Sequence, residues 1–309
     1  MEFIKLGSTN EKISKLGIGT WKLGSDKNST IKIIKETLNT GINLVDTAQM
    51  YQNEEIVGEA IQDEDVFLAT KVSPHNFHER DILRSCSESL HKLRIKTIDL
   101  YQLHWPNPSV KISETMRAME KLVDEGKIRY IGVSNFSLPE LEEAINSMKK
   151  YEIVSNQIEY SVLTRDIGDS LSEFCRKNKI TLIAYSPLGS GKLFDEKYKE
   201  MFVLLKDIGN KYDKTPTQVA LNWLLQKENL CAIPKFSSRE HLLENLGSFN
   251  WKLKPNDIKK IDDFGQLKKP LSSMLNPVTK RMAPLWSNIM TRKEKKRINN
   301  TSEEKKEND

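Results

Sequence analysis

Short apolar runs alternate with longer amphipathic stretches along most of the chain. The runs predict strands that start near Leu16, Asn43, Val66, Ile98, Tyr130, Ile153, Thr181 and Leu230. Between them, apolar residues recur at the 3.6-residue spacing of a helix, as they do through residues 82–93. Strands that alternate with helices are typical of a parallel sheet. The pattern therefore predicts an α/β fold of the (β/α)8 TIM-barrel type.

Both ends of the chain depart from this repeat. Residues 3–6 and 12–14 predict an N-terminal β-hairpin plug at the bottom of the barrel, and residues 256–264 predict an extra C-terminal helix. We expect residues 1–265 to form the barrel and residues 266–291 to lie over its mouth or against its side. Met274, Met282 and Trp286 are candidates for pocket walls or, with a slight preference, for packing against the barrel side. Residues 292–309 lack an apolar period, which predicts a disordered, charged tail.

Composition narrows the range of partners. The chain has 309 residues and a formal charge of +5, from 48 basic and 43 acidic residues. This modest surplus is spread along the chain, so we expect no nucleic-acid partner. We expect no membrane association and a cytoplasmic location, because no run is long and apolar enough for a transmembrane or signal segment. Cys86, Cys175 and Cys231 are read as structural thiols. An H-x-x-H pair, His75 and His78, lacks nearby carboxylate or thiol ligands, so no metal site is expected.

Four polar side chains stand at or just beyond the ends of predicted strands: Asp46, Tyr51, Lys71 and His104. The carboxyl ends of parallel barrel strands meet at one mouth, where barrel enzymes place their chemistry. A free phenol has a pKa of about 10. A Lys71 ammonium ~4 Å away, worth about 4 kcal/mol, would lower the pKa of Tyr51, and Asp46 would hold that charge in place. A neutral His104 would aim a substrate carbonyl, so the four side chains predict a proton-donating active site.

Eight segments, in order, resemble the aldo-keto reductase family. They include LGIGTW at 16–21, DTAQMY at 46–51, LYQLHWP at 100–106 and AYSPLG at 184–189, and the others lie at 69–72, 132–136, 156–160 and 233–235. The resemblance covers about three quarters of the chain and stops short of its last forty-odd residues. It implies a barrel that binds an extended nicotinamide dinucleotide without a Rossmann domain and reduces a small-molecule carbonyl compound.

Carried over by position, the resemblance also implies roles for individual residues. Asp46, Tyr51, Lys71 and His104 match the catalytic tetrad, with Tyr51 as the acid. The matched cofactor contacts are Thr20, Asp46, Ser134, Asn135, Gln157, Tyr185, Ser186, Leu188, Ser190, Lys235 and Asn245. Among them, Ser134, Asn135 and Gln157 match the residues that hold the carboxamide, and Tyr185 matches the ring that stacks on the nicotinamide. The matched substrate contacts are Trp21, His104 and Trp105.

Departures from the family pattern leave the choice between NADPH and NADH open. Many members have glycine where this chain has Gln52. Members that prefer NADPH have a small hydroxyl residue and an arginine where this chain has Phe236 and His241, although Ser237 and Arg239 lie nearby. NADPH is favoured by Lys235, and NADH or dual use stays open. A non-catalytic, cofactor-binding regulatory barrel resembling channel-associated subunits is the alternative function. We expect a monomer or a small homo-oligomer.

Overall fold

A ring of eight parallel strands forms the centre of the protein, as described by a computed structural model of residues 1–23, 26–165 and 168–266. The strands are β3 (Ile18–Gly19), β4 (Leu44–Asp46), β5 (Phe67–Val72), β6 (Ile98–Leu103), β7 (Ile128–Ser134), β8 (Ile153–Glu159), β9 (Thr181–Tyr185) and β10 (Leu230–Ile233). Each pairs in parallel with the next. A bridge between Leu16 and Ala232 and the 2.8 Å bond from Gly17 N to Ala232 O close the ring. The predicted (β/α)8 barrel is confirmed, and each strand starts within two residues of its predicted position.

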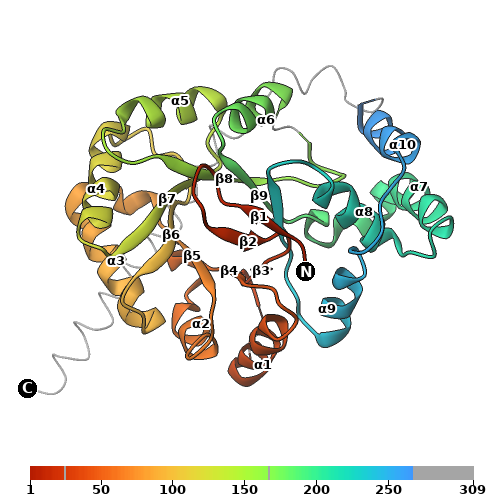
Figure 1. Ribbon diagram of the computed structural model, residues 1–309, viewed down its shortest axis with the longest axis horizontal. Coiled ribbons are helices and arrows are strands. Elements are labelled where there is room, and N and C mark those ends of the chain that lie inside the picture. The colour runs from red at the N-terminus through yellow and green to blue at the C-terminus, as the bar shows by residue number, and fades with distance from the viewer. Residues whose placement is uncertain (24–25, 166–167, 267–309) are drawn as a thin grey trace, which may run out of the picture. The chain divides into compact units, whose positions relative to one another are not determined.

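Helices surround the strands on the outside of the ring (Figure 1). They are α1 (Lys27–Leu38), α2 (Glu54–Ala60), α3 (Glu79–Leu93), α4 (Ile112–Asp124), α5 (Leu138–Ser147), α6 (Gly168–Lys177), α7 (Lys199–Asn210), α8 (Pro216–Leu225), α9 (Arg239–Leu246) and α10 (Pro255–Gln266). The loops of the described ranges contain 3-10 helices: η1 (Gln49–Tyr51), η2 (Pro74–Asn76), η3 (Gly189–Phe194) and η4 (Glu196–Tyr198). In the described part of the chain, no helix is both long and apolar enough to cross a bilayer.

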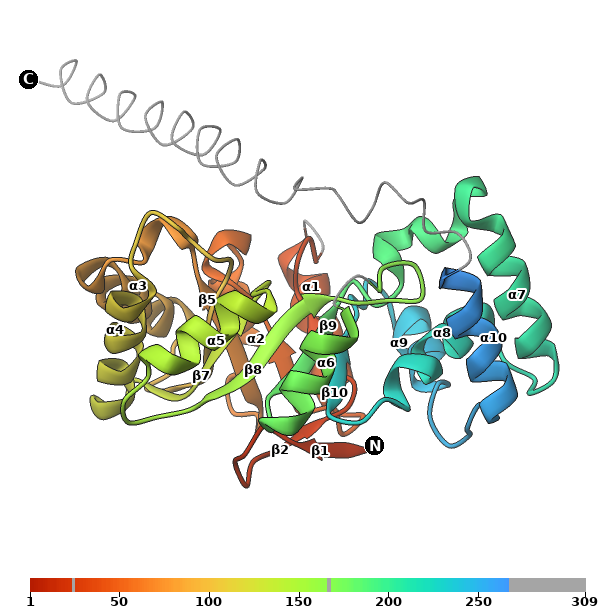
Figure 2. The same cartoon turned by 90° about the horizontal axis from the view of Figure 1, so that it is seen from above.

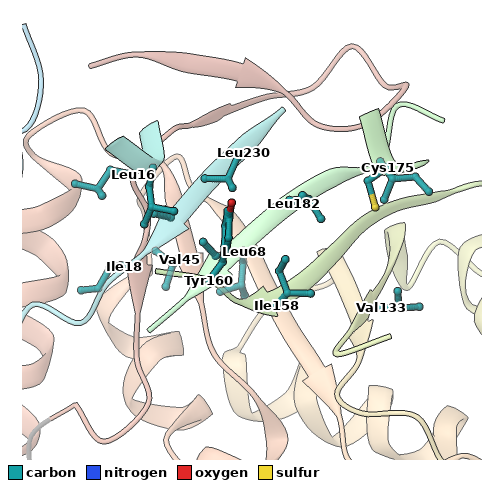
Figure 3. Packing of buried hydrophobic residues seen from close by; sticks show 14 of the residues in the cluster. Leu16, Ile18, Val45, Leu68, Val133, Ile158, Tyr160, Cys175, Leu182 and Leu230 are labelled. Atoms are coloured by element: carbon teal, nitrogen blue, oxygen red, sulfur yellow. The ribbon is translucent and has the colours of Figure 1, made fainter. Parts of the chain in front are cut away.

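Apolar side chains of the strands form two layers, because neighbouring residues in a strand point to opposite faces. One layer joins the strands to the helices and includes Leu68, Leu182 and Leu230 (Figure 3). The other fills the barrel interior and includes Leu100 and Ile183, which alternate with residues of the first layer. The site described below lies above this filled interior, so the barrel is a packed core with its chemistry at one end.

The N-terminal hairpin closes the end of the barrel where the strands begin. β1 (Phe3–Lys5) pairs antiparallel with β2 (Lys12–Ser14). Gly7 N bonds to Thr181 Oγ1 at 2.8 Å, at the start of β9, and the buried Leu6 belongs to the interior cluster. Figure 2 shows the hairpin at one end of the barrel. The predicted plug is confirmed, and it leaves the opposite mouth for the site.

By its internal contacts the chain divides into two units, residues 1–265 and 266–309. The extra helix predicted at 256–264 is α10, and it is anchored on α8 by a 2.9 Å bond from Trp223 Nε1 to Asp262 Oδ1. The expectations for residues 267–309, including the pocket walls at Met274, Met282 and Trp286 and the disordered tail, lie outside the described residues.

The three cysteines are buried thiols, and one histidine of the H-x-x-H pair contacts a carboxylate. Cys86, Cys175 and Cys231 are free and buried, and burial raises the pKa of each thiol. His78 Nδ1 lies 3.1 Å from Glu114 Oε1. Within the described ranges, no cluster of three or more metal-ligating side chains occurs.

Candidate active site

The four predicted catalytic residues lie at one mouth of the barrel because the strands that precede them end there. Asp46 is the last residue of β4, Lys71 lies near the end of β5, and His104 directly follows β6. Tyr51 lies in η1, the single helical turn after β4. Residues 44–46, 67–72 and 98–103 are almost wholly buried, as apolar runs in a parallel barrel are. The structure brings all four side chains together.

Asp46 and Lys71 form a buried ion pair. Lys71 Nζ lies 2.5 Å from Asp46 Oδ1 and also donates to Thr47 O at 2.8 Å. The Lys71 side chain is fully buried. Burial lowers the pKa of Lys71, and the negative charge of Asp46 opposes this effect. The Asp46 carboxylate at this distance therefore offsets part of the cost of burying the Lys71 ammonium at the floor of the mouth.

Tyr51 lies against this ion pair. Its ring centroid is 5.1 Å from Lys71 Nζ. Burial first, and then the negative charge of Asp46, raise the pKa of Tyr51 above its ordinary value. The expectation that Lys71 lowers this pKa is therefore wrong for the protein alone, because Asp46 already neutralises the ammonium and desolvation then prevails. Tyr51 accordingly keeps its proton at neutral pH.

The turn that carries Tyr51 ends in an unusual backbone conformation. Gln52 has φ 56° and ψ 28°, in the left-handed region. Glycine adopts this region without penalty, whereas a residue with a Cβ loses roughly 1–2 kcal/mol there. This explains why the position suits glycine.

His104 and Trp105 form an aromatic side of the mouth, and Trp21 lies in the turn after β3. The Tyr51 and His104 rings meet edge to face, with centroids 5.6 Å apart and planes at 73°. Trp105 stacks on His104 at 4.2 Å and is 41% exposed, and Trp21 is 50% exposed. Burial first, and then the positive charge of Lys71, hold the pKa of His104 well below its ordinary value. His104 is therefore neutral, so it can hydrogen-bond a ligand without acting as a strong acid.

Polar side chains from β7, β8 and β9 continue the site beside the ion pair. Tyr185 Oη donates to Asn135 Oδ1 at 2.8 Å, and Asn135 Nδ2 donates to Ser134 Oγ at 3.0 Å. Ser134 Oγ donates to Gln157 O at 3.0 Å. Asn135 has φ 62°, in the left-handed region, and its Nδ2 also donates to His104 O at 3.1 Å. The four residues predicted to hold a nicotinamide thus form one continuous network.

One carboxylate oxygen joins this network to the ion pair. Gln157 Nε2 donates to Asp46 Oδ2 at 2.8 Å, and Gln102 Nε2 donates to the same oxygen at 3.4 Å. Gln102 was not anticipated from the sequence. Its signal is an amide two residues after Leu100, on the face of β6 that points into the barrel.

A second unanticipated residue, Asn53, fastens the loop between β4 and α2. Thr47 Oγ1 donates to Asn53 Oδ1 at 2.8 Å, and Asn53 Nδ2 donates to Thr20 O at 2.9 Å. Thr20 N in turn bonds to Asp46 O at 3.0 Å. Thr20 Oγ1 is buried and has no hydrogen-bond partner in the described part of the protein. The backbone around Asp46 is therefore fixed from both sides.

The remaining predicted cofactor contacts lie away from the tetrad. Ser190 Oγ donates to Ser186 Oγ at 2.9 Å in the loop after β9, and both residues have positive φ. Leu188 is half-buried in this loop. Lys235 is exposed beyond β10 and its Nζ donates to Lys22 O at 3.4 Å. Asn245 is buried in the last turn of α9. None of these side chains has a described contact with the four tetrad side chains.

The chain is similar to known proteins over the region that builds the barrel. The sequence model of the Aldo/keto reductase family matches residues 15–266. Glyoxal reductase of Bacillus subtilis (strain 168) is 35% identical over 251 residues, covering 80% of this chain and 87% of the relative. A crystal structure of a thermostable aldo-keto reductase with the inhibitor epalrestat is 40% identical, with a TM-score of 0.81, and covers 86% of this chain and all of the neighbour.

A further solved structure is similar over the same region. The aldo-keto reductase of Klebsiella pneumoniae in complex with NADPH is 29% identical, with a TM-score of 0.78, covering 85% of this chain and 94% of the neighbour. The family match spans the strands and helices that build the barrel and every residue of the site described above. The chain belongs to the aldo/keto reductase family.

Proposed function

We propose that this protein reduces aldehydes or ketones to alcohols with a nicotinamide cofactor, and that Tyr51 delivers the proton. The observation that carries the proposal is the convergence of four groups at one mouth. The Asp46–Lys71 pair lies at 2.5 Å, with the Tyr51 ring 5.1 Å from Lys71 Nζ and the His104 ring 5.6 Å from the Tyr51 ring. A phenol, a neutral imidazole and a buried cation together suit protonation of a carbonyl oxygen.

The protonation state of Tyr51 fits this role. A dihydronicotinamide supplies a hydride to the carbonyl carbon when it is bound. The oxygen that then becomes an alkoxide is a stronger base than a phenolate, so Tyr51 can donate its proton even with a raised pKa. Lys71 stabilises the phenolate that remains. His104, held neutral, donates a hydrogen bond to the carbonyl and orients it toward Tyr51.

The residues present suit a nicotinamide. The Ser134, Asn135 and Gln157 side chains offer both donors and acceptors, as a carboxamide requires. Tyr185, whose hydroxyl is tied to Asn135, offers a fixed ring face for stacking. We propose that these four residues hold the nicotinamide and that the Ser186–Ser190 loop, Lys235 and Asn245 hold the rest of the cofactor.

NADPH is the proposed cofactor, in line with the NADPH complex of the Klebsiella neighbour. Lys235 is an exposed cation suited to a phosphate group. Arg239 Nη1 is 3.8 Å from Glu36 Oε2, which reduces its availability, and His241 Nδ1 lies 2.8 Å from Ser237 Oγ. A histidine at this place supplies less constant charge than an arginine, so we expect NADH to bind as well, more weakly.

The proposed substrates are small carbonyl compounds, with α-dicarbonyls as the first to test because a relative is named glyoxal reductase. The exposed faces of Trp21 and Trp105 would form walls of that pocket. The experiment is oxidation of NADPH and of NADH, measured in parallel with a panel of dicarbonyls, simple aldehydes, ketones and sugars.

The decisive variant is Tyr51→Phe, which keeps the ring and removes only the hydroxyl. We expect it to abolish reduction and to leave NADPH binding unchanged, with Tyr198→Phe, at the half-buried last residue of η4, as the control that keeps both. Turnover retained in Tyr51→Phe would refute the assignment of the acid.

The regulatory-barrel alternative predicts tight cofactor binding with negligible turnover. It gains no support from the three proteins compared above, each of which is named a reductase. The same panel assay distinguishes the two functions.

A further inference from the structure

Gln102 is a fully buried amide in the interior of the barrel. On β6 it pairs in register with Lys71 on β5 and with Gly132 on β7. Leu100, on the same face of β6, belongs to the apolar interior cluster. An amide in such surroundings destabilises a fold unless it is hydrogen-bonded, so the partners of Gln102 indicate why it is tolerated.

Both partners of Gln102 belong to the candidate active site. Its Nε2 donates to Asp46 Oδ2 at 3.4 Å, and its Oε1 accepts from Gln157 Nε2 at 3.4 Å. Both distances lie at the long end for hydrogen bonds. Gln157 Nε2 holds the same Asp46 oxygen at 2.8 Å. Two amides therefore share one carboxylate oxygen, and Gln157 makes the shorter bond.

The neighbouring strand leaves room for the Gln102 side chain. A Cβ added to Gly132 would lie 2.9 Å from Gln102 Cγ and 2.5 Å from Ser155 Oγ. Any larger residue at position 132 would therefore displace Gln102. With glycine there, no β7 side chain occupies the space beside Gln102 Cγ, and a shift of the amide by roughly 0.4 Å would bring its bond to Asp46 to an ordinary length.

The geometry points to Gln102 as a positioning residue that takes over the hydrogen bond to Asp46 Oδ2 when Gln157 binds the nicotinamide carboxamide. This inference rests on the proposed function, because it requires a nicotinamide cofactor. With this exchange, Asp46 Oδ2 accepts a hydrogen bond from an amide both in the free protein and in the cofactor complex. Asp46 then stays directed at Lys71, and Gln102 contributes more to the cofactor complex than to the free protein.

The test compares Gln102→Met with the wild type in cofactor affinity. The variant keeps the length of the side chain and removes the amide. We expect the Kd for NADPH to rise about tenfold, as for loss of one hydrogen bond to a charged group. Binding of adenosine 2′,5′-bisphosphate, which lacks the nicotinamide, should not change, and neither should the melting temperature of the free protein.

Tyr101→Phe is the matched control. Tyr101 precedes Gln102 on β6, is equally buried, belongs to the layer facing the helices, and its hydroxyl has no partner among the described residues. Its removal should leave the affinity for both ligands unchanged. Gln102→Leu serves as the second variant if Gln102→Met does not fold, with the same expected loss of NADPH affinity.

The possible results separate this inference from the proposed function. If the wild type does not bind NADPH, the proposed function itself fails. If the wild type binds and the Gln102 variants bind NADPH equally well, the positioning role is overturned. An equal loss of affinity for NADPH and for the bisphosphate would also overturn it, because it would reveal general damage to the mouth.

Discussion

The buried ion pair offers the sharpest test of the energetics of the site. In Lys71→Met, Asp46 would remain 2% exposed and keep its amide donors but lose its cation. At 2.5 Å and an effective dielectric of ~20, the direct attraction between the two charges is about 7 kcal/mol. Part of this is offset by the desolvation of both groups, and removing one partner of such a pair typically costs about 3–5 kcal/mol.

We therefore expect Lys71→Met to lower the free energy of unfolding by about 3–5 kcal/mol at neutral pH. The double variant Asp46→Asn/Lys71→Met removes both charges, and it should return to within about 1 kcal/mol of the wild type. Urea unfolding of the wild type, the two single variants and the double variant measures the coupling directly. The double variant should fold and yet not reduce carbonyl compounds, which separates stability from catalysis.

An exposed ion pair supplies the control. Lys177 Nζ lies 2.8 Å from Glu173 Oε1 on α6, and both side chains are more than half exposed. Lys177→Met should leave the free energy of unfolding unchanged within error, since solvent screens such pairs. The reasoning would be refuted by a loss under about 1 kcal/mol in Lys71→Met, or by strictly additive effects of the two single variants.

Three further changes test other parts of the structure. Burial depresses the pKa of His104, so below pH ~6.5, the ordinary pKa of histidine, the unfolded chain binds a proton that the folded protein does not. The free energy of unfolding should therefore fall on acidification by up to about 1.4 kcal/mol per pH unit. His104→Gln should remove that component from urea unfolding curves across this range. Thr215→Ala removes the N-cap of α8, where Thr215 Oγ1 accepts from Gln218 N at 3.2 Å, and should cost about 1 kcal/mol, whereas Thr215→Ser should not. A Cβ at Gly58 would lie 2.5 Å from a backbone oxygen at the end of α3, so Gly58→Ala should cost about 1–3 kcal/mol, and an unchanged melting temperature would contradict this close approach.

Strand positions were predictable because buried parallel strands leave contiguous apolar runs, and polar residues directly after them fall at one mouth. The meeting of Asp46, Lys71 and His104 followed from that rule alone. The α7 helix, Lys199–Asn210, was not predicted, because it follows two 3-10 turns with no parallel in the repeat. The φ of 62° at Asn135 could not be predicted either, because no glycine marks the position as left-handed.

Electrostatics were the least predictable part of the site. A spacing rule indicates which charges are close, but the balance between burial and charge decides the direction of a pKa shift. Burial first, and then the negative charge of Asp46, raise the pKa of Tyr51, whereas the Lys71 ammonium, paired with Asp46, was expected to lower it. The role of Gln102 was not predicted for a related reason, because the pattern of a strand does not indicate which buried amide will contact a carboxylate.

The closure of the barrel between Leu16 and Ala232 also constrains how the protein can be made. The two sides of that seam are separated by most of the chain, so a ribosome must complete β10 before the first strand gains its second neighbour. Until then, every nascent intermediate presents unpaired backbone amides and carbonyls along both margins of a curved sheet, a template for mispairing with other chains. A chain truncated before residue 230 would lack β10, so the two edges of its sheet would stay unpaired.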